Sequence, residues 1–241
     1  MKKNLLKKIS SHTDSYKIIV NEEPLSIASE CYRKIKVTLD FTNVDKKIQV
    51  IQFTSGLQGE GKSTTTVNTA YTYLEDGLKV LVVDLDLRRP KIHRYFQVKN
   101  ENGLSDYLAG NIKLEECIKH SDKGLDFINS GSKVPSPLSI LNSNNIEELF
   151  SDLRSKYDII IVDSTPCLMV SDAVVSSRLC DGVLFVVNEQ SSEKTACKNA
   201  IKLLKNNGVN VLGAVFNGTT KKRNAGNEYK YMYKYEQKGS K

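Results

Sequence analysis

The sequence predicts an α/β fold, a doubly wound and mostly parallel sheet with helices on both faces. Three aliphatic runs, at 80–83, 159–162 and 183–187, contain no polar residue. Unbroken runs are typical of parallel strands that are buried on both faces, whereas half-exposed strands alternate. Segments of helical character separate the runs, and this rhythm predicts crossover connections between parallel strands. Ligands of such sheets bind beyond the carboxyl ends of the strands.

Length and composition agree with one such domain. The chain has 241 residues, with 39% hydrophobic and 26% charged side chains, which is sufficient for a packed core and excludes global disorder. None of the five cysteines forms a C-x-x-C pair, so we expect a reduced protein without a disulfide framework or a zinc site.

The positive charge belongs to the two ends of the chain. The formal net charge is +7, yet residues 1–10 carry +4 and residues 221–241 carry +5, so the stretch between them is slightly acidic. Basic ends suit an anionic membrane face or an acidic partner, although they are more commonly solubilising. The aliphatic runs are far shorter than the roughly 20 residues of a membrane-spanning helix, and no signal-peptide core precedes them. We therefore expect a cytoplasmic protein, in which any membrane association goes through a partner or through the basic ends.

Three regions are expected along the chain. Residues 1–23 are polar and lysine-rich, which predicts a loosely ordered arm. A helix is predicted over 26–41, because apolar residues recur at four-residue spacing from Ile27 to Leu39. The expected organisation is a basic arm and helix at 1–45, an α/β core at 46–220 and a flexible tyrosine-rich tail at 221–241.

Within the core, strands are predicted where aliphatic residues cluster and helices where polar, periodic segments follow them. The predicted strands span 48–53, 79–85, 125–129, 158–163, 182–188 and 211–217. The predicted helices span 64–76, 90–96, 104–109, 114–120, 145–155, 172–178 and 192–206.

A phosphate-binding loop follows the first core strand. Residues 56–63 read Gly-Leu-Gln-Gly-Glu-Gly-Lys-Ser and fit G-x-x-x-x-G-K-[ST]. The glycines let backbone N–H groups meet phosphate oxygens, and the helix start adds its free N–H groups. An ordinary glycine-rich turn is the alternative, which the strand, the Lys62-Ser63 pair and the helix disfavour. The loop predicts a P-loop NTPase, with Lys62 on the β- and γ-phosphates and Ser63 on Mg²⁺. The nucleotide contacts expected here are Gly56, Gly59, Glu60, Gly61, Lys62, Ser63 and Thr64.

Acidic residues follow two of the buried strands. Asp163 ends the run at 159–162, which is a Walker B pattern, and an acid there can bind Mg²⁺ beside Ser63. Asp84 and Asp86 follow the run at 80–83, and two-residue spacing places both carboxylates on one side of the chain. They could share the metal, or one could accept a proton from an attacking hydroxyl. The alternative for this pair is an N-cap and a salt bridge to Arg88 or Arg89.

The C-terminal tail carries tyrosines at strict two-residue spacing, and four of the chain's eleven tyrosines lie within seven residues. Without apolar partners they do not predict a core strand. They could stack on a partner or on single-stranded nucleic acid, or they could accept phosphate. The nucleotide-phosphate loop in the same chain favours phosphorylation and no nucleic acid. The four are Tyr229, Tyr231, Tyr233 and Tyr235.

Together these segments carry a family resemblance. The loop at 56–63, the Asp84-x-Asp86-x-Arg88-Arg89-Pro90 segment and the stretch at 163–166 resemble the Walker A, Walker A′ and Walker B motifs of bacterial tyrosine kinases. These are the P-loop kinases of capsule and exopolysaccharide assembly. The stretches at 103–108 and 212–218 are also similar to that family. The tail resembles its autophosphorylated tyrosine cluster.

The resemblance implies an ATP-dependent protein-tyrosine autokinase that needs Mg²⁺. It implies that Asp84 is the base, and that Asn217 lies near the adenine. A helix motif, E-x-x-R-x-x-R in the family, would support a ring-shaped oligomer in which one tail enters the neighbouring site. Lysine in the last place keeps the charge and loses the fork geometry of arginine. The residues assigned in this way are Lys62, Asp84, Asp86 and Asp163 for catalysis, Ser63, Asp84 and Asp163 for the metal, and Glu30, Arg33 and Lys36 for the ring.

The family also implies partners. We expect a transmembrane adaptor that activates the kinase at the inner face of the membrane, a cognate phosphotyrosine phosphatase, other protein substrates and control of polysaccharide synthesis and export. A Min- or Par-type positioning ATPase is the alternative. It would carry a lysine where this chain has Leu57, and it would lack the tyrosine tail. An inactive regulatory subunit is disfavoured because the site residues are intact.

Overall fold

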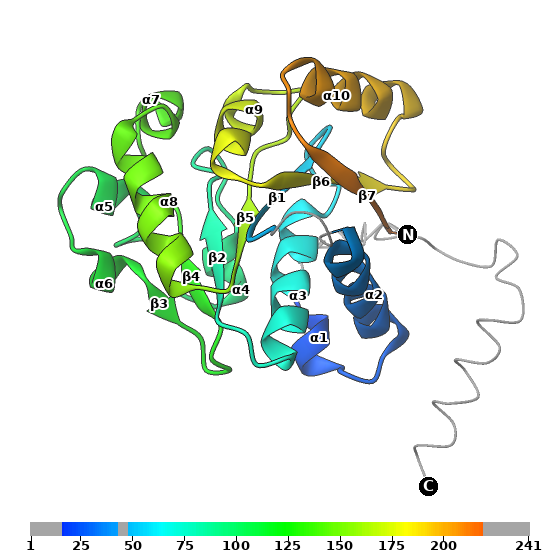
Figure 1. The fold of residues 1–241 in the computed structure, drawn as a ribbon, viewed down its shortest axis with the longest axis horizontal. Coiled ribbons are helices and arrows are strands. Elements are labelled where there is room, and N and C mark those ends of the chain that lie inside the picture. The colour runs from blue at the N-terminus through cyan, green and yellow to red at the C-terminus, as the bar shows by residue number, and fades with distance from the viewer. Residues whose placement is uncertain (1–15, 43–47, 219–241) are drawn as a thin grey trace, which may run out of the picture.

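The computed structural model of the chain describes residues 16–42 and 48–218, which form a sheet flanked by helices on both faces (Figure 1). The strands are β1 (Val50–Ser55), β2 (Val80–Asp84), β3 (Lys119–His120), β4 (Asp126–Ile128), β5 (Ile159–Asp163), β6 (Gly182–Asn188) and β7 (Val211–Asn217). The helices are α1 (Ile19–Glu22), α2 (Ile27–Thr42), α3 (Lys62–Glu75), α4 (Ile92–Tyr95), α5 (Leu104–Leu108), α6 (Leu114–Cys117), α7 (Pro137–Leu141), α8 (Asn144–Lys156), α9 (Asp172–Ser176), η1 (Ser177–Leu179) and α10 (Lys194–Asn206).

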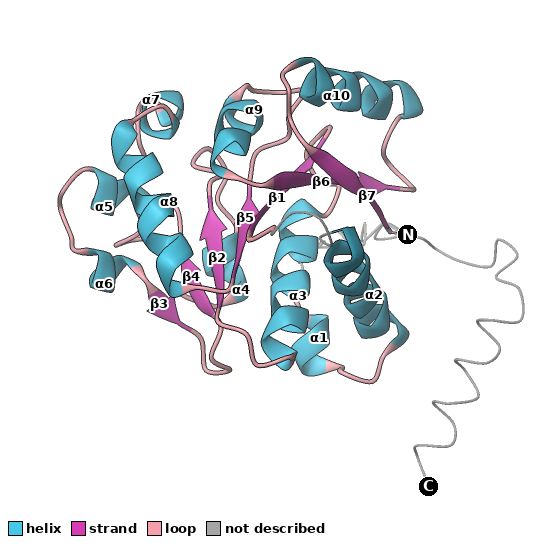
Figure 2. Ribbon diagram, in the orientation of Figure 1, coloured by secondary structure: helices cyan, strands magenta, loops and turns pink. Residues whose placement is uncertain are grey.

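The sheet has seven strands in the order β3-β4-β2-β5-β1-β6-β7. Every pair is parallel except β3 with β4, so the predicted doubly wound, mostly parallel sheet is confirmed (Figure 2). The register of β2 on β5 sets Asp84 beside Asp163, the last residue of each strand. Strand β1 pairs with β5 on its other side, and the two strands are parallel. The loop that follows β1 therefore leaves the sheet at the same edge as Asp84 and Asp163.

The core has two layers, one on each face of β1, β2 and β5, which are buried along their whole length. Helix α3 packs on one face through residues such as Val67 and Ala70, and α8 packs on the other through Leu149 and Leu153. Helix α3 is buried although it is rich in threonine. Its polar groups are satisfied locally, as when Thr66 Oγ1 donates to the carbonyl of Lys62 at 2.9 Å.

The structure differs from the sequence prediction in three short segments. Residues 16–23, expected in a loose arm, contain α1, and Ile18 and Val20 belong to the core. The backbone N–H of Val20 donates to Asn68 Oδ1 of α3 at 3.1 Å. Helix α7 was not predicted. The helix predicted at 114–120 is shorter than expected: α6 forms its first four residues, and β3 takes its last two. These segments are too short for local propensity to decide, and their tertiary partners fix them instead.

Asp181 ties the starts of two central strands together, which gives a first testable prediction. Its Oδ2 accepts the N–H groups of Gln49 and Val50 at 2.8 and 2.7 Å, and Arg154 donates to both carboxylate oxygens. Burial alone would raise the pKa of Asp181, but the hydrogen bonds from Arg154 and the two backbone groups hold this pKa below its ordinary value.

A depressed pKa means that the contribution to stability is present above the ordinary pKa of an aspartate and is lost as the pH falls through the folded-state value. We expect Asp181→Asn to lower the free energy of unfolding at pH 7 by about 1–3 kcal/mol, and to make that free energy fall less between pH 5 and pH 3. Urea unfolding monitored by circular dichroism measures both quantities. Asp158→Asn, at another strand start, is the matched control; an unchanged pH slope in Asp181→Asn would contradict the assignment.

Candidate active site

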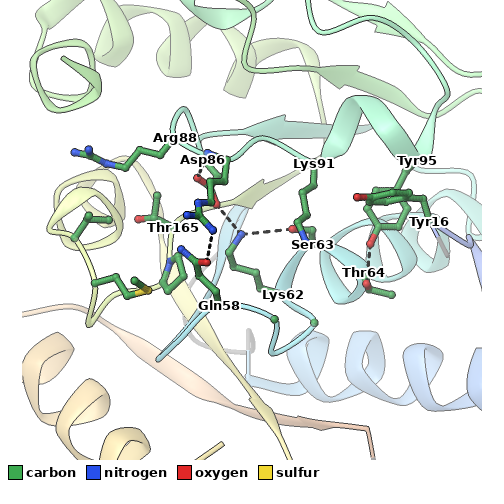
Figure 3. Close-up of a pocket in the computed structure, with 16 residues that line it drawn as sticks. Tyr16, Gln58, Lys62, Ser63, Thr64, Asp86, Arg88, Lys91, Tyr95 and Thr165 are labelled. Carbon is green, nitrogen blue, oxygen red and sulfur yellow. Dashed lines mark hydrogen bonds and ion pairs between the residues drawn. The ribbon is translucent and has the colours of Figure 1, made fainter. Parts of the chain in front are cut away.

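A pocket of about 530 Å³ lies beyond the carboxyl ends of β1, β2 and β5 (Figure 3). Its walls come from the loop after β1 with the start of α3, from the segment after β2, and from the segment after β5. Residues far apart in the chain meet here because parallel strands end at a common edge. The predicted residues Gly59, Gly61, Lys62, Ser63, Thr64 and Asp86 line the pocket.

The glycine loop is held in shape by its own residues and by β7. Gly61 has φ +89°, a left-handed conformation that favours glycine, and a Cβ there would also displace the side-chain amide of Asn217, whose Nδ2 would lie 1.8 Å away. Glu60 is 3% exposed; its Oε2 accepts the N–H of Leu57 at 2.8 Å and its Oε1 bonds the hydroxyl of Ser192. The structure thus places Glu60 and Asn217 against the loop backbone. Gly56, at the end of β1, also lies outside the pocket lining.

The ammonium group of Lys62 lies close to the carboxylates of Asp86 and Asp163. Its Nζ lies 3.0 Å from Asp86 Oδ2, 3.4 Å from Asp163 Oδ1 and 3.5 Å from Ser63 Oγ. Burial lowers the pKa of Lys62, but the charges of Asp163 and Asp86 outweigh this effect and raise it. The side chain therefore carries a positive charge at neutral pH and can contact phosphate oxygens at this position.

The three predicted acids occupy different positions. Asp84 is fully buried outside the pocket; its carboxylate accepts backbone N–H groups of Asp86, Lys91 and Ile92, each at 3.1 Å. These contacts hold the segment between β2 and α4, but the N-cap residue of α4 is Lys91 and not Asp84. Asp86 instead lines the pocket and faces Lys62. Burial raises the pKa of Asp84 well above its ordinary value, and the charges of Asp163 and Asp86 raise it further.

Asp163 has the properties expected of a metal ligand. It is fully buried, and its Oδ2 has no hydrogen-bond partner in the part of the chain that the structure describes. A buried carboxylate oxygen without a partner indicates a place for a cation. Within residues 16–42 and 48–218, no three His, Cys, Asp or Glu side chains form a closed metal cage. Mg²⁺ does not need one, since it is usually held by one or two carboxylates together with phosphates and waters. Asp163 and the Ser63 hydroxyl are the residues that fit it here.

Several pocket residues were not predicted from the sequence. Tyr95 Oη lies 2.7 Å from Thr64 Oγ1, and the ring of Tyr16 packs edge-on against Tyr95 with centroids 5.2 Å apart. Figure 3 shows this aromatic wall beside Ser63 and Lys91. Nothing in the sequence signals Tyr16, because it lies in the segment that was expected to be loose. Gln58 occupies a variable position of the phosphate loop and Lys91 follows the 84–90 segment, so only their position could have suggested them.

The two arginines after Asp86 reach across the pocket mouth. Arg88 donates to both carboxylate oxygens of Asp172, at 2.7 and 3.1 Å, and Arg89 Nη1 donates to Gln58 Oε1 at 2.6 Å. The alternative in which Asp84 and Asp86 form salt bridges to these arginines is therefore wrong. Of the two arginines, Asp86 contacts only Arg89, whose backbone N–H donates to Asp86 Oδ1 at 2.9 Å.

The proposed ring residues on α2 make contacts inside the chain. Arg33 forms a two-point ion pair with Glu75 at 2.7 and 2.8 Å, and Lys36 pairs with Asp40 and Asp76. Glu30 lies 3.6 Å from Arg33. These contacts join α2 to the end of α3. The tail tyrosines Tyr229, Tyr231, Tyr233 and Tyr235 lie outside the described residues.

Comparison with known proteins relates this pocket to a family. A family model described as an AAA domain matches residues 46–207. Tyrosine-protein kinase YwqD of Bacillus subtilis is 36% identical over 215 residues, which cover 89% of this chain and 90% of YwqD. Putative tyrosine-protein kinase CapB of Staphylococcus aureus is 31% identical over 217 residues, which cover 90% of this chain and 94% of CapB.

Comparison with solved structures leads to the same family. The chimerical protein CapA2B2 matches with a TM-score of 0.82 and 34% identity, covering 85% of this chain and 90% of that one. The septum site-determining protein MinD of Pyrococcus horikoshii, solved with Mg-ADP, matches with a TM-score of 0.60 and 27% identity, covering 73% of this chain and 72% of MinD. The P-loop fold is common to both, and CapA2B2 is the more similar by both measures.

Proposed function

The chain belongs to the bacterial tyrosine kinases, and from this membership we propose that it is an ATP-dependent protein-tyrosine autokinase that phosphorylates its own C-terminal cluster in trans. The acceptors are Tyr229, Tyr231, Tyr233 and Tyr235. The observation that supports this proposal best is the pocket itself. A P-loop lysine, a loop of backbone N–H groups and a pocket-facing carboxylate converge at one edge of the sheet.

The side chains support an in-line transfer of a phosphoryl group. The loop amides and Lys62 hold the ATP phosphates, and Mg²⁺ held at Ser63 and Asp163 would neutralise their charge. The tyrosine oxygen forms a bond to the γ-phosphorus while the bond to the β–γ bridging oxygen breaks, so ADP leaves. The phenolic proton passes to a carboxylate, because a tyrosine hydroxyl with a pKa near 10 is a poor nucleophile. Asp86 faces the pocket and is placed to accept it. Asp84 was the first candidate for this role, but it is fully buried and does not line the pocket.

A positioning ATPase is the competing function, and the likeness to MinD is the observation that favours it. Two features weigh against it. Leu57 stands where the signature lysine of those ATPases would be, and it is 37% exposed. The chain is also more similar to CapA2B2 than to MinD in fold and in sequence.

The remaining roles follow from family membership. In the described part of the chain no helix is both long and apolar enough to span a bilayer. We propose that the kinase works in the cytoplasm, at the inner face of the membrane, where a transmembrane adaptor activates it and a cognate phosphatase reverses its modification. Rings of the kinase, supported by Glu30, Arg33 and Lys36, would let one tail reach the next pocket. Phosphorylation of the tail, and of other protein substrates, would then control capsule or exopolysaccharide synthesis and export.

Transfer between chains is directly testable. A chain with Lys62→Met and a mass tag serves as acceptor, and an untagged wild-type chain serves as donor with MgATP and the cytoplasmic end of the adaptor. Mass spectrometry should find phosphotyrosine on the tail of the tagged chain, and replacing all four tail tyrosines with Phe should remove it. Phosphate on the wild-type chain alone would show transfer within one chain. ADP formation without any phosphotyrosine would favour the positioning ATPase.

A further inference from the structure

Two cations at the pocket mouth have no acidic partner among the described residues. The guanidinium of Arg89 is exposed and contacts a neutral amide, Gln58 Oε1. The Lys91 ammonium lines the same pocket and forms no ion pair or hydrogen bond within residues 16–42 and 48–218. Both side chains come from the segment that follows β2, next to Asp86. They leave uncompensated positive charge on the side of the pocket where the proposed base lies.

The other two cations of the pocket are already engaged. Lys62 pairs with carboxylates beneath the glycine loop, and Arg88 is held by Asp172 in a two-point ion pair. In the proposed function, Lys62, the loop amides and the start of α3 bind the nucleotide phosphates. Arg89 and Lys91 are therefore available for a different anion. A cleft that concentrates unpaired positive charge attracts such an anion.

Once it is phosphorylated, the tail supplies an anion at a fixed two-residue spacing from the next tyrosine. Its tyrosines occupy every second position from Tyr229 to Tyr235. In an extended peptide, residues two apart lie on the same side of the chain, about 6.8 Å from each other. If the tail binds in this form, a phosphate on one tyrosine would lie on the same side of the peptide as the next acceptor hydroxyl.

Charge makes the first transfer the difficult one. Residues 221–241 carry a net +5 before modification, with Lys230 and Lys234 between the tyrosines, so the tail is repelled by Arg89 and Lys91. Each phosphate adds about −1.5 to −2. The planar fork of an arginine matches a phosphate in a two-point, charge-assisted contact.

We propose that Arg89 and Lys91 form a subsite for a phosphotyrosine two residues from the acceptor tyrosine, so that each transfer primes the next along the tail. The ligand class is an aryl phosphate monoester on an extended peptide. The proposal rests on the proposed autokinase function. The subsite binds and orients the peptide, and it takes no part in the breaking or forming of bonds.

Binding of a phosphopeptide tests the subsite without requiring catalysis. The protein is the full chain with its four tail tyrosines replaced by Phe, with MgADP bound. The probe is a fluorescein-labelled peptide of residues 228–236 with Tyr229→Phe and Tyr235→Phe, in which Tyr231 is free and Tyr233 is phosphorylated or not. Fluorescence anisotropy should show that the phosphate tightens binding about tenfold, as expected for one charge-assisted contact pair. The effect should shrink with added salt.

The variant Arg89→Gln with Lys91→Gln should reduce this preference to less than about twofold. The control Lys198→Gln with Lys202→Gln removes the same charge from the exposed face of α10 and should keep it. A phosphotyrosine moved to position 232, on the opposite side of the peptide, should bind less tightly. Equal binding of the two probes, or a preference that survives Arg89→Gln with Lys91→Gln, would overturn the subsite.

A separate readout distinguishes the subsite from the kinase proposal. The peptide with phosphorylated Tyr233 is incubated with MgATP, the adaptor segment and the same protein. Failure to phosphorylate Tyr231, with the binding preference intact, would sink the kinase proposal and leave the subsite. Loss of affinity for a fluorescent ATP analogue in Arg89→Gln with Lys91→Gln, without loss of the peptide preference, would assign these cations to the nucleotide and overturn the subsite.

Discussion

Lys62→Met should abolish phosphotyrosine formation, lowering the transfer rate by about 10³-fold or more. The ammonium of Lys62 is the only positive charge within 3.5 Å of Asp86 and Asp163 among the described residues. Methionine keeps the length of the side chain but cannot neutralise charge that develops on the transferred phosphoryl group. Incorporation of ³²P from MgATP, with phosphotyrosine detected by mass spectrometry, measures the loss.

Folding must be checked in the same variant, because Lys62 is buried among carboxylates. Removing one partner of a buried ion pair typically costs about 3–5 kcal/mol unless the acids take up protons. Lys62→Arg keeps the charge and serves as a second variant; its larger, planar head should fold but transfer poorly. Lys202→Met, on an exposed face of α10, is the matched control. A folded Lys62→Met that still makes phosphotyrosine at a wild-type rate would refute the role of this side chain.

Asp86→Asn and Asp84→Asn should fail in different ways. Asp86 lines the pocket, so its amide variant should lose the proton acceptor, with a drop of about 10²–10⁴-fold in transfer. The variant should still fold, because Lys62 keeps Asp163 as an ion-pair partner. Asp84 accepts three backbone N–H groups of the segment after β2. Its amide variant presents an NH₂ group to such donors, and we expect the free energy of unfolding to fall by about 1–3 kcal/mol.

Two measurements on each variant separate the roles. Single-turnover transfer at saturating MgATP reports the chemical step, and urea unfolding without nucleotide reports stability. Asp122→Asn, in a turn far from the pocket, controls for the loss of one carboxylate. The original assignment of Asp84 as base would be restored if Asp84→Asn kept its stability and lost transfer, while Asp86→Asn stayed active.

The architecture and the phosphate loop could be read from the sequence because both depend on local pattern. Unbroken aliphatic runs mark strands buried on both faces, and the runs at 80–83 and 159–162 became β2 and β5. A loop of glycines between a strand and a helix has few other uses, so residues 56–63 located the pocket. The segment at 16–23 gave no such signal, because its apolar residues Ile18 and Val20 are buried only by contact with α3.

The sequence by itself determined the kind of chemistry: a nucleotide-phosphate loop, acids at strand ends and a run of tyrosines. What only the tertiary structure decided is which of these groups face one another. Asp84 and Asp86 are equivalent by spacing. In the structure, however, Asp84 accepts backbone N–H groups outside the pocket, whereas Asp86 lines the pocket. Arg88 and Arg89 are adjacent, yet one is neutralised by Asp172 from a distant helix and the other is not. The spacing of residues along a strand determines on which side of the chain a side chain lies. Its burial and its hydrogen-bond partners depend on elements that are distant in the sequence.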